Sequence, residues 1–122
     1  MTDVEIRSSN DYATVLVVAM DNKPLKESGK ILVQVGTTER PLGWKTKPAS
    51  IAGRAGEEVV NFGHAPWMIV RAGVEISVAN PALKTARVLD ANGMAVGVIP
   101  LESSGGHVTL KFPPDALYVV LQ

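Results

Sequence analysis

Hydrophobic and polar residues alternate along three segments of the chain. The hydrophobic members are Val4 and Ile6, then Val74, Ile76 and Val78, and then Val108, Leu110 and Phe112. A period of two residues places one face of a β-strand on a core and the other in solvent. Two further runs, Tyr12–Met20 and Leu117–Leu121, are almost continuously apolar. We expect these runs to be central strands buried on both faces, or strands covered by a neighbouring domain.

Turn-forming residues separate these segments at regular intervals. Leu89 and Met94 flank Asp90–Gly93, whose Asn-Gly pair supplies the positive φ angles that tight hairpin turns need. The pattern predicts a hairpin between about Lys84–Leu89 and Ala95–Leu101. No long segment carries a 3.6-residue hydrophobic period. The sequence therefore predicts one all-β domain over residues 1–122, an antiparallel two-sheet β-sandwich (jelly-roll or immunoglobulin-like) of about 8–10 strands without substantial helix.

The segment Gly36–Gly56 differs from the rest because its alternation is weak. It contains Pro41, Pro48 and Gly53, and its aromatic residue, Trp44, stands among polar neighbours. Irregular stretches of about twenty residues are uncommon in compact domains and often serve function. We expect an irregular loop here that faces a partner or carries a binding function.

Composition and charge narrow the range of partners. Twelve basic residues balance twelve acidic ones among 122 residues. A neutral chain lacks the basic footprint of nucleic-acid or anionic-membrane binding, so we expect neither partner. The acidic and polar start, Met1–Glu5, does not resemble a signal peptide, and the longest apolar run, Val15–Met20, is too short to span a bilayer.

Candidate catalytic and metal-binding residues are few. The chain has no cysteine, and its two histidines, His64 and His107, are not spaced as a metal pair. Adjacent Glu57 and Glu58 would point to opposite faces of a strand and could not form the carboxylate pair of a glycosidase. The aspartates fall in turn signals, where their side chains satisfy backbone donors. We therefore expect no catalytic residues, no metal site and no cofactor.

Carbohydrate binding remains as a hypothesis, because sugars are held by aromatic faces with polar neighbours. Trp44 is either an exposed ligand platform or an anchor for its loop, and Arg40, Lys45 and Tyr118 are the accompanying candidates. Phe112 is in register with Val108 and Leu110, so we expect it in the core. We expect Trp67, which precedes Met68–Val70, to pack as well.

Short motifs along most of the chain resemble those of the C-terminal accessory β-sandwich domain of bacterial glycoside hydrolases. The matching segments are Val15–Leu25, Glu27-Ser28, Lys30–Val33, Gly43-Trp44, Phe62–Pro66, Val74–Val78, Ala86–Gly93 and Leu117–Leu121. Asp21-Asn22 departs from the Asp-Gly usual in that group, and Gly36–Arg40 replaces an Asn-containing stretch. These departures leave the expected fold intact and put a shared loop function in doubt.

The resemblance implies a non-catalytic module that packs against or stabilises the catalytic domain of a parent glycoside hydrolase. It also implies that the parent is secreted, so that the chain is extracellular or periplasmic. The first alternative is a carbohydrate-binding module that recognises a polysaccharide through Trp44, Tyr118, Arg40 and Lys45. A stand-alone hydrolase is the least favoured interpretation, because the chain offers no acid–base pair.

Overall fold

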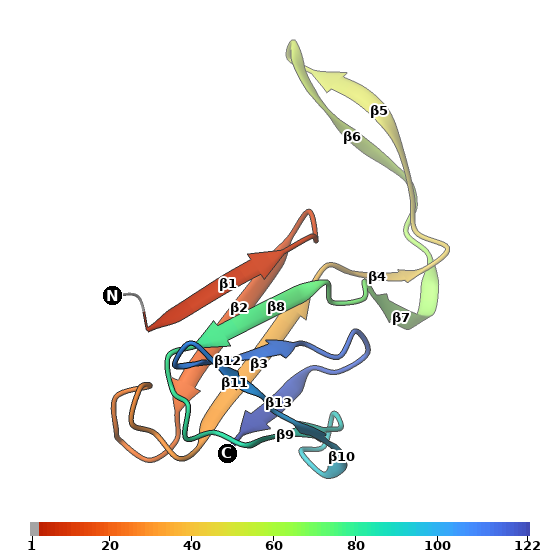
Figure 1. The fold of residues 1–122 in the computed structure, drawn as a ribbon. Coiled ribbons are helices and arrows are strands. Elements are labelled where there is room, and N and C mark those ends of the chain that lie inside the picture. The colour runs from red at the N-terminus through yellow and green to blue at the C-terminus, as the bar shows by residue number, and fades with distance from the viewer. Residues whose placement is uncertain (1–2) are drawn as a thin grey trace. The chain divides into compact units, whose positions relative to one another are not determined.

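The alternating segments form β-strands, and the computed structural model describes residues 3–122 as thirteen strands without a helix (Figure 1). The strands are β1 (Val4–Ser8), β2 (Ala13–Ala19), β3 (Ile31–Thr37), β4 (Glu39–Leu42), β5 (Lys45–Ile51), β6 (Arg54–Asn61), β7 (His64–Ile69), β8 (Val74–Val78), β9 (Thr85–Leu89), β10 (Ala95–Pro100), β11 (Ser103–Ser104), β12 (His107–Lys111) and β13 (Tyr118–Leu121). The chain divides into two compact units, which are described separately below. The sandwich runs to Thr37 and resumes at Arg71, and the ribbon unit is Thr38–Val70.

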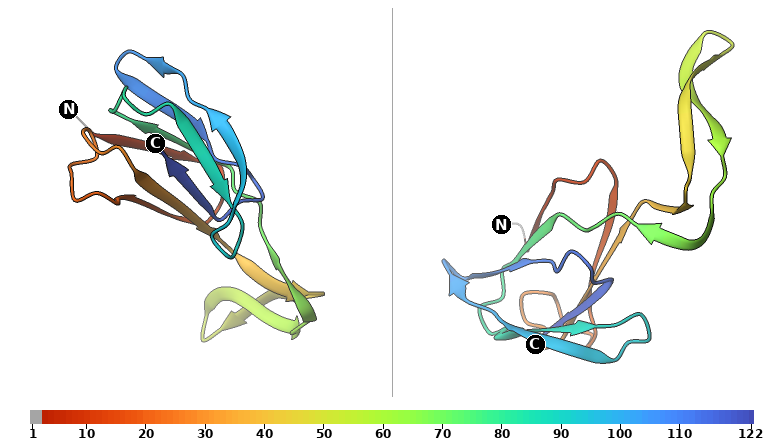
Figure 2. Two further views of the ribbon diagram at one scale, coloured as in Figure 1. Left: turned by 90° about the horizontal axis from the view of Figure 1, so that it is seen from below. Right: turned by 90° about the vertical axis from the view of Figure 1, so that its right-hand side faces the viewer.

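The sandwich consists of two antiparallel sheets, seen from two further directions in Figure 2. Sheet A has the strand order β1-β8-β12-β11, and sheet B has the order β10-β9-β13-β3-β2. Together they hold nine strands, which agrees with the predicted all-β sandwich. The predicted hairpin is confirmed: β9 pairs with β10, and the Asp90 amide donates to the Met94 carbonyl across the turn at 2.8 Å.

The core lies between the two sheets and is almost wholly aliphatic. Each sheet contributes the inward members of its alternating strands, with Phe112 added from the end of β12. The buried cluster is Ile31, Val33, Val35, Val74, Ile76, Val78, Leu83, Ala86, Leu101, Val108, Leu110, Phe112, Val119 and Leu121. The predicted core positions on β8 and β12 are therefore confirmed, including Phe112.

The two continuous apolar runs have different places in sheet B. Strand β13 is central, between β9 and β3, as predicted. Strand β2 is instead an edge strand, and Leu16, Val18 and Met20 on its outer side are exposed. A central position for Tyr12–Met20 is therefore wrong, because an apolar run does not determine the order of its strand in the sheet.

A small polar network closes the end of the sandwich after β2. The Ser28 hydroxyl donates to Asp21 Oδ1 at 2.7 Å, and the Gly29 amide donates to Asp21 Oδ2 at 2.9 Å. The buried Asn80 side chain donates to the carbonyl oxygens of Leu25 and Ser28 at 2.9 and 2.8 Å. These bonds tie the Asp21–Lys30 connection to the end of β8, so the Asp and Ser of the sequence motif serve the fold.

We expect Asp21 to give the sandwich part of its acid sensitivity. The Ser28 hydrogen bond, helped by the amides of Gly29 and Lys23, lowers the pKa of Asp21 below its ordinary value of 3.8. A pKa lowered by folding adds stability that is present above the unfolded-state pKa and is lost as pH falls through the folded-state pKa. In urea titrations, Asp21→Asn should be less stable than wild type at pH 7, and the two proteins should converge below pH 3.8. A constant difference at every pH would contradict this role.

The ribbon unit is a long excursion of the chain between β3 and β8. Strand β4 pairs with β7, and β5 pairs with β6, so the unit contains two two-stranded ribbons. The turn of the outer hairpin has positive φ at both Ala52 (49°) and Gly53 (77°), as a tight type I′ turn requires. Between the ribbons, Gly63 has a φ of 71°, and a Cβ atom there would lie 2.6 Å from the Leu42 carbonyl oxygen. No residue of the unit is buried.

The irregular loop expected over Gly36–Gly56 is therefore wrong in its conformation. The segment forms the end of β3, all of β4 and β5, the turn that follows, and the first three residues of β6. Alternation is weak because neither ribbon has a core on one side, so the usual signal of a half-buried strand is missing. Residues 3–122 contain no helix long and apolar enough to cross a membrane.

Candidate binding surface on the ribbon unit

The ribbon unit brings together two of the four residues proposed from the sequence for sugar binding. The Arg40 guanidinium carbon lies 5.4 Å from the centre of the Trp44 ring, a cation–π arrangement. Phe62 meets the same ring edge-on, with centroids 5.8 Å apart and planes at 82°. Trp44 is thus half-buried by an arginine and a phenylalanine, a geometry that suits an anchor between the two ribbons.

The other two candidates do not join this group. Lys45 follows Trp44 in the chain, but it opens β5 opposite Asn61 and is exposed. Tyr118 belongs to the sandwich, where it begins β13 and is half-buried. The structure therefore joins Arg40 with Trp44 and adds Phe62, which the sequence analysis did not single out.

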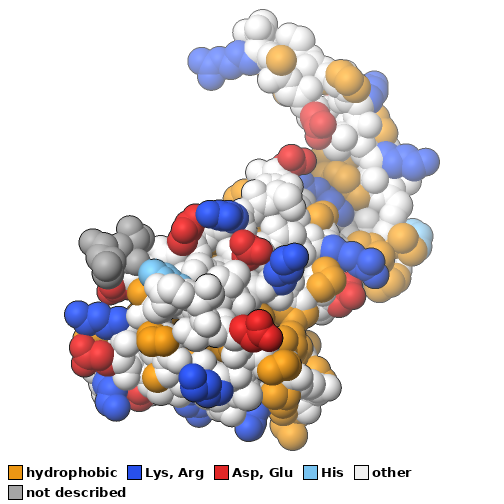
Figure 3. Space-filling model, in the orientation of Figure 1, with side chains coloured by type: hydrophobic (Ala, Val, Ile, Leu, Met, Phe, Trp, Pro, Cys, Tyr) orange, Lys and Arg blue, Asp and Glu red, His pale blue; other side chains and the backbone are white. Residues whose placement is uncertain are grey.

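Exposed apolar side chains are concentrated on the ribbon unit. Eight of the sixteen large hydrophobic residues that the described structure leaves exposed lie within its 33 positions. They are Leu42, Ile51, Val60, Phe62, Trp67, Met68, Ile69 and Val70. Neighbours on a strand point to opposite faces, so the set covers both faces of the ribbons, and we call it the apolar ribbon surface. Trp67 is 62% exposed and Phe62 73%. Orange side chains are visible along this part of the chain in Figure 3, and others lie on the sandwich.

The predicted packing of Trp67 is therefore wrong. Trp67 lies on β7 opposite Pro41 of β4, in a ribbon that has no second layer to bury it. The run Trp67–Val70 resembled a core strand because core strands and unpartnered interface strands have the same apolar composition. That run was nevertheless the signal that could have revealed this surface.

Charge on the ribbon unit is sparse and nearly balanced. Four basic residues accompany three acidic ones, and Lys47 bridges Glu58 across β5 and β6 at 3.1 Å. Glu57 and Glu58 are neighbours on β6, as expected, and Glu57 opposes Pro48. The electrostatic part of any contact here is small, because these exposed charges are solvated and partly paired.

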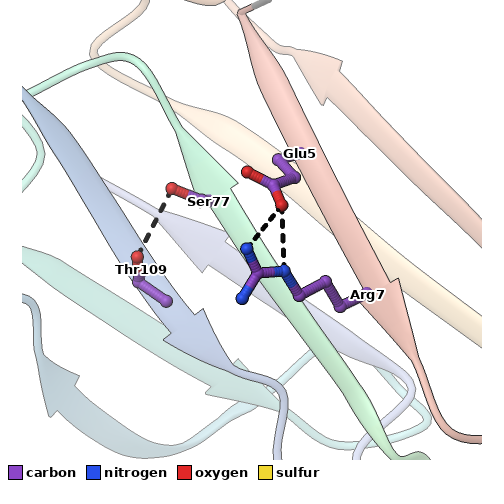
Figure 4. A network of polar contacts seen from close by, with 4 residues as sticks. All are labelled: Glu5, Arg7, Ser77 and Thr109. Carbon is purple, nitrogen blue, oxygen red and sulfur yellow. Dashed lines mark hydrogen bonds and ion pairs between the residues drawn. The ribbon is translucent and has the colours of Figure 1, made fainter.

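The outer face of sheet A is polar, in contrast to the apolar ribbon surface. Arg7 contacts Glu5 at 2.7 Å, and Thr109 donates to the Ser77 hydroxyl at 3.4 Å (Figure 4). Acidic and basic side chains stand over β1, β8 and β12 on the face toward the viewer in Figure 3. Such mixed, partly paired charge is typical of a solvated face.

The sandwich also has an open hollow of about 440 Å³ at one end of sheet A. Its lining includes Arg7, Glu75 and Lys111 beside Ser8 and Phe112. The histidines lie elsewhere: His64 Nδ1 is 2.7 Å from the Ala65 carbonyl oxygen, and His107 Nδ1 is 3.1 Å from that of Gly105. In the part of the chain that the structure describes, no three His, Cys, Asp or Glu side chains cluster as metal ligands.

Comparisons with known proteins give no further guide: no protein-family model, no curated protein and no solved structure matches this chain.

Proposed function

We propose that this chain is a non-catalytic accessory module that binds a partner protein through the apolar ribbon surface. The observation that carries the proposal is the concentration of exposed Phe, Trp, Met, Ile, Leu and Val side chains on two ribbons without a core. A two-stranded ribbon is only marginally stable alone in water and gains stability from a covering surface. Exposed apolar patches of this kind mark interaction sites.

The composition of the surface favours protein over polysaccharide. Five of its eight members are aliphatic, and Met68 adds a flexible, polarisable side chain. Protein interfaces are enriched in aromatic residues, Met and Arg, and Trp67, Phe62 and Arg40 complete that set. Sugar recognition depends more on hydrogen-bonding side chains placed around an aromatic face.

Within this proposal, the partner is inferred from the resemblance of the sequence motifs to accessory domains of glycoside hydrolases. It implies that the module packs against the catalytic domain of a secreted bacterial glycoside hydrolase and stabilises it. The matched motifs at Asp21, Ser28 and Asp90–Gly93 form turns of the sandwich. These residues serve the fold, as expected for a module that packs against a partner without doing chemistry.

Polysaccharide binding is the second candidate function. For this function, the exposed Trp67 is a better sugar platform than Trp44. Trp44 has Arg40 over its ring and Phe62 at its side, whereas Trp67 is 62% exposed. Affinity gels containing plant and algal polysaccharides would reveal this activity as retarded migration. Retardation lost in Trp67→Ala and kept in Trp44→Ala would replace the accessory role with carbohydrate binding.

The main proposal predicts that a glycoside hydrolase catalytic domain is encoded in the same genome region as this chain, and the test uses that domain. The purified domain is titrated against the wild-type chain and against the double variant Phe62→Ser, Trp67→Ser. We expect wild-type binding, weakened in the variant by at least about thirtyfold, because buried aromatic anchors carry much of an interface's energy.

The matched control is the double variant Met94→Ser, Val96→Ser, which changes two similarly exposed residues of the sandwich, one just before β10 and one within it. It should bind like wild type. Equal loss in both double variants would assign the interface to another surface, and absence of wild-type binding would contradict the packing role.

A further inference from the structure

Strand β2 is an unprotected edge of the sandwich. Proteins normally blunt an edge strand with charge, proline, a bulge or short length, because an open edge pairs with other strands. β1 carries Glu5 and Arg7, β10 carries a register shift and ends at Pro100, and β11 has two residues. β2 has seven residues, Ala-Thr-Val-Leu-Val-Val-Ala, with none of these features.

The backbone of β2 offers regular hydrogen-bonding groups along its open side. The Met20 amide donates to the Lys30 carbonyl at 2.8 Å. Every second residue of β2 bonds to the same neighbouring strand, so Val18, Leu16 and Thr14 also bond to β3. In an antiparallel ladder the intervening residues point their N–H and C=O groups the other way. Those of Ala13, Val15, Val17 and Ala19 therefore face the open edge.

The outer face of sheet B is apolar beside this edge. Leu16 and Val18 are nearly half exposed, and Leu32 and Val120 follow Val18 across the sheet in register. The corresponding face of sheet A carries Glu5, Arg7, Glu75 and Lys111. An apolar outer face beside an edge strand without protective features indicates that a partner adds to sheet B at β2.

The sequence of β2 is close to symmetric about Leu16. Ala13 matches Ala19, Val15 matches Val17, and Thr14 has the branched shape of Val18. Just outside the strand, Tyr12 and Met20 are both large, exposed and able to make a sulfur–aromatic contact. If two β2 strands pair antiparallel about a two-fold axis at Leu16, every side chain lies opposite one of equal or compatible size. The seven paired residues of each strand carry no charge.

We propose that β2 pairs antiparallel with β2 of a second copy of this chain about Leu16, joining the two B sheets into one of ten strands. Ala13 pairs with Ala19 and Val15 with Val17 of the other copy in hydrogen-bonded positions. Leu16 faces its own copy in a non-hydrogen-bonded position, where Cα atoms lie about 4.5 Å apart. The interface is isologous, so it closes at a dimer.

Sedimentation velocity on the full chain at micromolar concentrations tests the pairing, with Leu16→Lys as the disruptive variant. Leu16 is 48% exposed, so lysine is tolerated in the monomer but sets two ammonium groups face to face in the dimer. We expect a wild-type dimer and a dissociation constant raised about a hundredfold or more in the variant. Val98→Lys, at the other edge of sheet B and 61% exposed, should remain dimeric.

Cysteine crosslinking tests the register independently, since the chain has no cysteine of its own. Leu16→Cys should form an intermolecular disulfide rapidly on mild oxidation, because the proposed Cα separation suits a disulfide. Val18→Cys faces Thr14 of the other copy and should crosslink slowly. A monomeric wild type, a dimeric Leu16→Lys variant, or equally fast crosslinking at both positions would each overturn the proposal.

Discussion

Replacing Ile76 with alanine is expected to lower the free energy of unfolding by about 3 kcal/mol, the loss typical of a truncated core isoleucine. Ile76 is 1% exposed at the middle of β8, with Ile6 of β1 on one side and Leu110 of β12 on the other. The removed methyl and methylene groups leave a cavity that strands held on both sides cannot close. Chemical denaturation followed by circular dichroism measures the change.

Ile51→Ala is the matched control, because it removes the same atoms from a side chain that is 72% exposed. It should change the free energy of unfolding by less than about 0.5 kcal/mol. Similar losses in the two variants would mean that Ile76 is not in the core that stabilises the sandwich.

Asn80→Ala is expected to destabilise the sandwich by about 2–4 kcal/mol although it removes no apolar contact of note. The Asn80 amide satisfies the carbonyl oxygens of Leu25 and Ser28, and Asn80 and Ser28 are each only 1% exposed. Asn80 Oδ1 also accepts the Ala82 amide at 3.2 Å. A buried acceptor left without a donor costs about 1–3 kcal/mol, which makes the loss larger than that of an ordinary hydrogen bond.

Asn80→Asp separates hydrogen bonding from packing in this test. The carboxylate has nearly the same size but offers no donor at neutral pH, so it faces two carbonyl oxygens. The Asp variant should be at least as unstable as the Ala variant at pH 7, whereas the exposed Asn92→Ala should behave like wild type. A stable Asp variant would contradict the donor role.

Two kinds of feature could be predicted from the sequence: strands that are buried on one face, and turns formed by adjacent residues. The alternation at Val74–Val78 and Val108–Phe112 gives β8 and β12, because a core on one face imposes a period of two. The Asp90–Gly93 turn identifies the β9–β10 hairpin, because the chemistry that forms it lies within four residues.

Features that depend on distant partners could not be predicted in the same way. Nothing within Tyr12–Met20 distinguishes a central strand from an edge strand, because strand order depends on which segments return to either side. No residue near Trp67 in the sequence indicates that β7 pairs with β4 alone. Residue type alone makes Arg40 and Trp44 candidates, whereas the contact of Trp44 with Phe62 depends on how the two ribbons pair.

The two ends of the ribbon unit are hydrogen-bonded to each other. The Val70 amide donates to the Thr38 carbonyl at 3.0 Å, so the first and last residues of the unit are neighbours. An insert whose ends already meet imposes little loop-closure cost on the domain that carries it. The sequence of the ribbon unit can therefore diverge, lengthen or be exchanged during evolution while the sandwich keeps its stability, and the same junction is a natural site for grafting a foreign peptide.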